Sequence, residues 1–281
     1  MPLAQFRVYS LGDFKNYILN NNFLREITFI QNHHTWLPNY RSLVSNPGEM
    51  YWLESMRHSH IYERGWNDIG QHITTFPSGN VAICRPLHVT PAGIYGANRG
   101  AICIENFGNF DEGFDVMTEA HKNTIIQVNA ILCRKFGLKP NLQQVVYHHW
   151  YDTKGKRFSE DQVDSGDVLR NKLQKTCPGT NFFCDPVNRI KGNTIKSATE
   201  NFYPLITTAM GVVTENQPVS QQIIIRTVQA SKLNVRAGTG LTYPVIRQFS
   251  KGSLVNVYET DGDWCKVSAN AEEWASSKFL T

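Results

Sequence analysis

The chain has 281 residues, of which 41% are apolar and 19% are charged, and its formal net charge is +4. This length suits two domains, and the composition is typical of a folded globular protein rather than a disordered one. The small positive charge suits contact with an anionic surface but is too weak to indicate nucleic-acid binding, and an ordinary solvated surface explains it as well.

Six cysteines are spread along the chain without close pairs such as CxxC. A chain of this length does not need disulfides, so we expect free thiols, one of them a candidate metal ligand. No apolar run approaches the ~18 residues of a membrane span, so no membrane insertion is expected. The start "MPLAQFRVYS" lacks the basic and apolar segments of a signal peptide. We therefore expect synthesis in the cytoplasm, with a later release for any extracellular action.

The first predicted elements surround a pair of histidines. Near the N-terminus, "FKNYILNNNFLREI" has apolar residues at near-helical spacing and predicts a helix. A short apolar strand is then predicted to end at His33 and His34. In the loop-rich stretch that follows, residues 50–61 predict a helix. Residues 71–76 and 81–84, on either side of "PSGN", predict a hairpin.

Strands and helices continue to alternate beyond the hairpin. "GAICIENFGNF" predicts a buried strand that runs into a loop, and residues 117–136 predict an amphipathic helix that ends at Gly137. "QVVYHHWYD" predicts another strand, which ends at a second pair, His148 and His149. This alternation favours a mixed α/β domain over residues 1–212.

The composition and the hydrophobic pattern of the sequence change after residue 212. Residues 213–223 are polar, lack periodicity and contain a proline, so they predict a linker. Residues 224–281 then contain short apolar stretches separated by Gly, Asp and Ser turns every 8 to 12 residues. That pattern predicts a small all-β barrel as a second domain.

Each histidine pair can present only one imidazole to a common site, because neighbouring side chains of a strand point to opposite faces. Zinc accepts imidazole nitrogen and thiolate sulfur, and catalytic zinc sites use three protein ligands. One histidine of each pair, together with Cys177 of "KTCPGTNFF", would supply such a set. The competing interpretation is that the pairs arise by chance and that the cysteine is a buried thiol before a turn.

Five motifs, taken together and in order, resemble the zinc-dependent N-acetylmuramoyl-L-alanine amidases of the amidase-2 family, which is similar to the peptidoglycan recognition proteins. The motifs are "HHTW", "GWNDIGQH", "RGAICIENFGNF", "VVYHHW" and "KTCPGTNFF". The resemblance covers roughly residues 20–190. It implies a catalytic domain with a mixed sheet flanked by helices and with Zn²⁺ as its cofactor.

The resemblance also implies which residues hold the metal. The residues that match the family's zinc ligands are His33, His148 and Cys177. His34 and His149 then become supporting residues, although His149 can align with the ligand position as well as His148 can.

Three residues near these ligands are candidates for the reaction itself. Lys175 matches a family cation that steadies the oxyanion formed when an amide is cleaved. Gln71 stands where many relatives have a tyrosine, and glutamine is not a base, so it is expected only to hydrogen-bond substrate or water. Glu105 is therefore the expected general base, with His72 and His149 behind it. The alternative for Glu105 is a strand carboxylate paired with a basic group.

Two further residues of this domain, Trp36 and Asn98, are expected to bind substrate. Relative to the family, the chain carries a long insertion, residues 150–174, between the second histidine pair and the cysteine motif. We expect this insertion to form a loop or short helix over the site.

The tail has its own resemblance. "LNVRAGTGLTYPVIRQFSKGSLVNVYETDGDWCKV" is similar to the bacterial SH3-like domains, over about residues 225–281. Such domains bind peptidoglycan, which makes Tyr243, Trp264 and Trp274 candidates for a binding groove. The alternative is that a small barrel needs these aromatic side chains in its core.

The two resemblances together imply a modular peptidoglycan hydrolase of the phage or prophage endolysin type. Its partner would be bacterial peptidoglycan, both glycan and stem peptide, and it would cleave the amide between N-acetylmuramic acid and L-alanine. A non-catalytic protein that binds peptidoglycan is the alternative.

Overall fold

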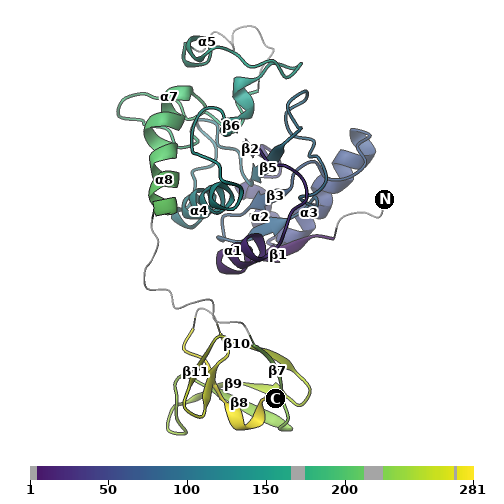
Figure 1. The fold of residues 1–281 in the computed structure, drawn as a ribbon, viewed down its shortest axis with the longest axis vertical. Helices are drawn as coiled ribbons and strands as arrows, with labels where there is room; N and C mark the ends of the chain where they lie inside the picture. Colours follow the sequence, from purple (N-terminus) through teal and green to yellow (C-terminus); the bar gives the residue numbers. More distant parts are fainter. Residues whose placement is uncertain (1–4, 166–174, 212–223, 269–270) are drawn as a thin grey trace. The chain divides into compact units, whose positions relative to one another are not determined.

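The computed structural model describes residues 5–165, 175–211, 224–268 and 271–281. The chain divides into two compact units, Met1–Val213 and Thr214–Thr281 (Figure 1). The linker predicted at residues 213–223 lies outside the described residues, as does the part of the insertion at residues 166–174.

A six-stranded mixed sheet forms the centre of the first unit, which confirms the predicted fold class. The strand order is β1-β4-β3-β5-β2-β6, in which β3, β5, β2 and β6 are parallel neighbours and β1 and β3 each pair antiparallel with β4. The strands are β1 (Arg7–Tyr9), β2 (Phe29–His34), β3 (Ile73–Thr75), β4 (Val81–Ile83), β5 (Ala101–Asn106) and β6 (Val145–Tyr147). The predicted hairpin is confirmed, as is the strand that ends at His33 and His34, whereas β6 stops at Tyr147 and the second histidine pair lies in the 3₁₀ helix His148–Trp150 that follows it.

Helices pack against both faces of this sheet. The helical segments are α1 (Leu11–Asn20), α2 (Tyr40–Ser45), α3 (Glu49–His58) with a π turn (Ser59–Glu63), α4 (Glu119–Phe136), α5 (Glu160–Asp164), α7 (Ile195–Ser197) with a π turn (Ala198–Phe202), and α8 (Tyr203–Gly211). Side chains of α1, α4 and α8 join one apolar cluster with Ile102 and Ile104 of β5. Side chains of α3 join a separate cluster with Ala82 and Phe107. Because Ala82 and Ile83 alternate between the two clusters, the sheet lies between two helical layers.

Helix α4 confirms the amphipathic helix predicted for residues 117–136. The side chain of Thr118 accepts a hydrogen bond from the backbone N–H of His121 and caps the first turn. Gly137 ends the helix in the left-handed conformation, with φ of 66°. The predicted N-terminal helix is also present, but it begins earlier, at Leu11, and stops at Asn20; its buried residues are Phe14 and Ile18.

A buried amide pair fastens the first histidine strand to α4. Asn32 of β2 and Asn129 of α4 are both fully buried. Asn32 Nδ2 donates to Asn129 Oδ1 at 2.9 Å, and Asn129 Nδ2 donates back to Asn32 Oδ1 at 3.1 Å. Each side chain therefore satisfies polar atoms of the other that would otherwise be costly to bury.

The second unit is all-β, as predicted. A five-stranded antiparallel sheet has the order β11-β12-β13-β8-β9, and β10 pairs with β7 in a two-stranded one. Its strands are β7 (Ile224–Thr227), β8 (Lys232–Arg236), β9 (Val245–Ser250), β10 (Leu254–Val257), β11 (Glu259–Asp261), β12 (Trp264–Lys266) and β13 (Trp274–Ser276). The unit has its own apolar core, which includes Val235, Val255, Cys265 and Ala275.

Two further expectations concern thiols and membranes. All six cysteines are free, as predicted. Within the described ranges, no helix combines the length and the apolar character that crossing a membrane requires.

The amide pair gives a test of this packing. Asn129→Leu leaves the amide of Asn32 buried without its partner, so the free energy of unfolding should fall by about 1–3 kcal/mol. Urea unfolding followed by far-UV circular dichroism measures this loss. The matched control is Asn123→Leu, the same substitution at an exposed position of α4, which should stay within about 0.5 kcal/mol of the wild type. Equal losses in both variants would contradict this assignment.

Candidate metal centre

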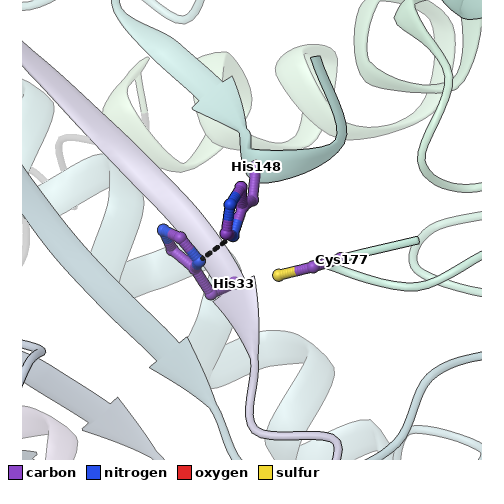
Figure 2. A group of neighbouring side chains, drawn as sticks. All are labelled: His33, His148 and Cys177. Carbon is purple, nitrogen blue, oxygen red and sulfur yellow. Dashed lines mark hydrogen bonds between the residues drawn. The ribbon is translucent and has the colours of Figure 1, made fainter. Parts of the chain in front are cut away.

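Two neighbouring parallel strands bring one histidine of each pair together. Asn32 of β2 is the register partner of Tyr147 of β6, so His33 and His148 follow at adjacent strand ends. His33 Nδ1 and His148 Nδ1 are 3.1 Å apart, and the two rings lie edge to face with their centroids 4.8 Å apart (Figure 2). The strand ends therefore present two imidazole nitrogens to one point.

Cys177 completes a three-residue group. Its sulfur points toward the two imidazoles (Figure 2), and the ligand atoms of His33, His148 and Cys177 all lie within 4.8 Å of one another. Two nitrogens bound to a tetrahedral zinc at 2.0–2.1 Å would be roughly 3.3 Å apart, close to the distance found here. Two imidazoles and a thiolate are also a donor set that zinc prefers. The residues therefore fit a zinc ion.

Hydrogen bonds fix the tautomer of His33. Gln31 Nε2 donates to the carbonyl of Ala97 at 2.6 Å, which turns Gln31 Oε1 toward His33 Nε2, 3.5 Å away. The same oxygen accepts the backbone N–H of Ile94 at 3.2 Å. Since an amide oxygen only accepts, Nε2 of His33 carries the proton and Nδ1 keeps its lone pair for a metal.

Burial sets the protonation of the group. It is the main cause that lowers the pKa of His33 far below its usual value and the pKa of His148 to about 3. Both imidazoles are therefore neutral, the form that binds metals. Burial also raises the pKa of Cys177 well above its usual value. A divalent cation would reverse this preference, and the backbone N–H of His34, 3.4 Å from the sulfur, favours the thiolate.

The group lies in the wall of a cavity of about 770 Å³. The cavity has indole side chains from Trp36, Trp52 and Trp66, and its cations are Arg64 and Lys175. The metal-ligating group and the aromatic side chains therefore line one cavity, which suits an extended ligand with both polar and apolar parts.

Glu105 lies in the same cavity beside the metal-ligating group. In the register of the sheet it pairs with His33 on one side and with Thr74 on the other, so these three side chains share one face. Its Oε2 is buried and has no hydrogen-bond partner among the described residues. Burial raises its pKa to about 8, against the opposing effect of the charge on Lys175. This carboxyl can therefore exchange a proton near neutral pH.

Gln71 also lines the cavity, with 1% of its surface exposed. Its Nε2 donates to Thr74 Oγ1 at 3.1 Å, while its Oε1 is buried without a partner in the described part of the chain. The amide is thus held with its acceptor free. It can take a hydrogen bond from a ligand but cannot accept a proton at neutral pH.

His72 and His149, the residues expected to support Glu105, both bond to backbone groups. Both nitrogens of His72 are occupied, because Nε2 donates to the carbonyl of Val89 at 2.8 Å and Nδ1 accepts from the N–H of Cys103 at 3.1 Å. His149 Nδ1 is 2.8 Å from the carbonyl of Lys175, to which it donates. Backbone groups therefore hold both ring nitrogens of His72 and the Nδ1 of His149. The expected support of Glu105 by these two histidines stays a prediction.

The remaining candidates of the first unit divide between site and scaffold. Trp36 lines the cavity with 56% of its surface exposed. Asn98 is absent from the cavity lining, and its Oδ1 accepts the backbone N–H of Gly93 at 2.9 Å, which is a structural role. Sequence reasoning did not single out Arg64 or Trp66, although Trp66 belongs to the quoted motif "GWNDIGQH".

The aromatic candidates of the second unit differ in exposure. Tyr243 is 47% exposed, Trp264 is half-buried, and Trp274 is only 6% exposed. The indole N–H of Trp274 donates to Glu272 Oε2 at 2.8 Å. Tyr243 therefore offers the most surface to a ligand, whereas Trp274 belongs mainly to the interior of the barrel.

Similar proteins are known. The Bacillus subtilis (strain 168) protein YrvJ, provisionally named an N-acetylmuramoyl-L-alanine amidase, is 40% identical over 50 residues, which are 17% of this chain and 10% of YrvJ. The chain thus covers about a tenth of that relative. Wild-type PGRP-LB of Drosophila aligns with 19% identity over 57% of this chain and 79% of its own, at a TM-score of 0.42. The amidase LysC of Clostridium intestinale URNW aligns with 23% identity over 59% of this chain and 83% of its own, at a TM-score of 0.39.

Two family models also match. The bacterial SH3 domain model matches residues 231–281, in the all-β unit. The model described as N-acetylmuramoyl-L-alanine amidase matches residues 23–180, which include the whole metal-ligating group. Because this match spans more than half of the 281 residues, the chain belongs to the N-acetylmuramoyl-L-alanine amidase family.

Proposed function

We propose that the protein is a zinc-dependent peptidoglycan hydrolase that cleaves the amide between N-acetylmuramic acid and L-alanine. The observation that carries this proposal is the complete group of His33, His148 and Cys177 in the wall of a large cavity, within the region that matches the amidase family. The all-β unit, which matches the bacterial SH3 domain, would hold the enzyme on the wall.

The residues around the group have complementary tasks in this proposal. A bound zinc ion would act as a Lewis acid on the scissile carbonyl and would make a water molecule more acidic. Glu105 would take the proton of that water, since it lines the same cavity and its Oε2 has no hydrogen-bond partner among the described residues. Lys175 would place its positive charge near the oxyanion that forms when water adds to the amide carbonyl. Gln71 would accept a hydrogen bond from substrate or water.

Product analysis tests the activity directly. Mass spectrometry of digested peptidoglycan should find stem peptides with a free L-alanine amino terminus and intact glycan strands. Binding to peptidoglycan without these products would instead identify a non-catalytic recognition protein.

We further propose, from the sequence features alone, that the enzyme is made in the cytoplasm and reaches the wall on release, as an endolysin or autolysin does.

The metal-ligating group predicts the effect of removing its sulfur. Cys177→Ser should lower zinc occupancy and abolish wall lysis, because a hydroxyl is a far poorer zinc ligand than a thiolate. Zinc content by atomic emission and dye release from labelled walls measure the two effects. The control is Cys184→Ser, since the Cys184 thiol donates to Asn181 Oδ1 and a serine can keep that bond. Full zinc and full activity in Cys177→Ser would remove this residue from the site.

The role of Glu105 predicts a loss of turnover at constant zinc. Glu105→Gln is nearly isosteric and removes the basicity, so turnover on a soluble muropeptide should fall by ~10²-fold or more. Zinc content should not change, because Glu105 is not a ligand in this proposal. Glu26→Gln, at an exposed position, serves as the control. Near-normal turnover in Glu105→Gln would show that the base lies elsewhere.

The division into two units predicts separable activities. A chain shortened to Met1–Val213 retains the whole metal-ligating group and should cleave soluble muropeptide normally. It should be slower on intact walls, because tethering by the second unit raises the effective substrate concentration. The quantity to compare between the full and the shortened chain is the rate on intact walls divided by the rate on soluble muropeptide. An unchanged ratio would rule out a targeting role for the second unit on that wall.

A further inference from the structure

The second histidine of each pair contacts the loop that carries Cys177. We call residues 175–181 the cysteine loop. His34 donates its backbone N–H to Cys177 Sγ at 3.4 Å, and His149 donates its backbone N–H to the carbonyl of Cys177 at 2.7 Å. The two strand ends that supply imidazole ligands therefore also hold the residue that supplies the sulfur.

His149 makes a second contact with this loop through its ring. Nδ1 donates to the carbonyl of Lys175 at 2.8 Å, and the side chain is only 1% exposed. His149 thus holds the loop on both sides of Thr176, once by its backbone and once by its imidazole. Because it follows His148 directly in the chain, any shift of the loop relative to His149 is also a shift relative to a ligand.

The opposite side of the loop is held by the segment after β5. Asp111 Oδ2 accepts from Thr176 Oγ1 at 2.9 Å, and its Oδ1 accepts from the N–H of Thr180 at 3.1 Å. The carbonyl of Phe110 accepts from the N–H of Asn181 at 2.7 Å. These bonds fix where the loop lies but do not reach the two ligand-bearing strands.

His34 completes this connection on the first strand. Its Nδ1 accepts the backbone N–H of Phe110 at 3.2 Å, so its ring is tied to the segment that holds the loop. The ring of His149, by contrast, bonds the loop itself, next to a ligand and to the cation Lys175. His149 is therefore the side chain whose loss would most directly separate Cys177 and Lys175 from His148.

We propose that His149 is a positioning residue of the metal centre: its ring hydrogen bond to the Lys175 carbonyl fixes the positions of Cys177 and Lys175 relative to His148. This inference rests on the proposed function only for its kinetic consequence. Its structural consequence is a higher affinity of the site for the metal. Residues that orient metal-binding groups through hydrogen bonds commonly change metal affinity by ~10–100-fold when they are replaced.

Two substitutions of unequal hydrogen-bonding ability test this role. In His149→Asn, the side-chain Nδ2 lies where Nδ1 of histidine lay and can still donate to the Lys175 carbonyl. In His149→Phe the ring remains but the donor is lost. The zinc dissociation constant, from competition with a chromophoric chelator, should rise by ~10–100-fold in His149→Phe. It should stay close to the wild-type value in His149→Asn.

Two readouts separate positioning from general damage to the fold. Cobalt replaces zinc and reports thiolate ligation through its sulfur-to-metal charge-transfer band, which should weaken in His149→Phe and persist in His149→Asn. In turnover of a soluble muropeptide, kcat should fall in His149→Phe while KM stays within about twofold, because uniform substrate binding is not removed. If His149→Phe does not fold, His149→Gln replaces it, since its amide nitrogen corresponds to Nε2 rather than Nδ1.

Each outcome decides a separate question. Wild-type zinc affinity and an unchanged cobalt band in His149→Phe would overturn the positioning role. A wild-type protein that binds zinc but releases no product would overturn the proposed function, while the zinc and cobalt measurements would still decide on His149. A wild-type protein that binds no zinc would overturn both.

Discussion

The pleat of one short strand organises the whole centre. Asn32, His33 and His34 are consecutive on β2, so Asn32 and His34 point to one face of the sheet and His33 points to the other. Asn32 pairs with Asn129 of α4, His33 joins the metal-ligating group, and His34 bonds the backbone of Phe110. A strand anchored on its helical side can hold a ligand steadily on the other side, next to the cavity.

The electrostatics of the cavity follow from what is buried there. The imidazoles are neutral and the carboxyl of Glu105 has a raised pKa, in both cases chiefly because these groups are withdrawn from water. The cationic side chains of Lys175 and Arg64 lie along the same cavity. The lining therefore carries an excess of positive charge, which favours anionic species at the reactive end.

Much of the first unit can be predicted from sequence, because its strands and helices follow local patterns. The apolar run before His33 and the capped, periodic stretch of α4 are examples. The choice between His148 and His149 cannot be made in this way, since β6 ends at Tyr147 and the chain turns into a 3₁₀ helix at His148, where strand alternation no longer applies. The hydrogen bond between Asp111 and Thr176 joins residues that are 65 positions apart in the sequence, so no local pattern predicts it.

The two units have separate sheets and separate apolar cores. Among the described residues, no member of the metal-ligating group comes from the second unit, and the seven strands described there pair with one another. Exchange of residues 224–281 for a different β domain would therefore keep the three ligand residues and the hydrogen bonds described for them. Substitutions in the smaller second unit can therefore accumulate without altering any residue of the metal-ligating group.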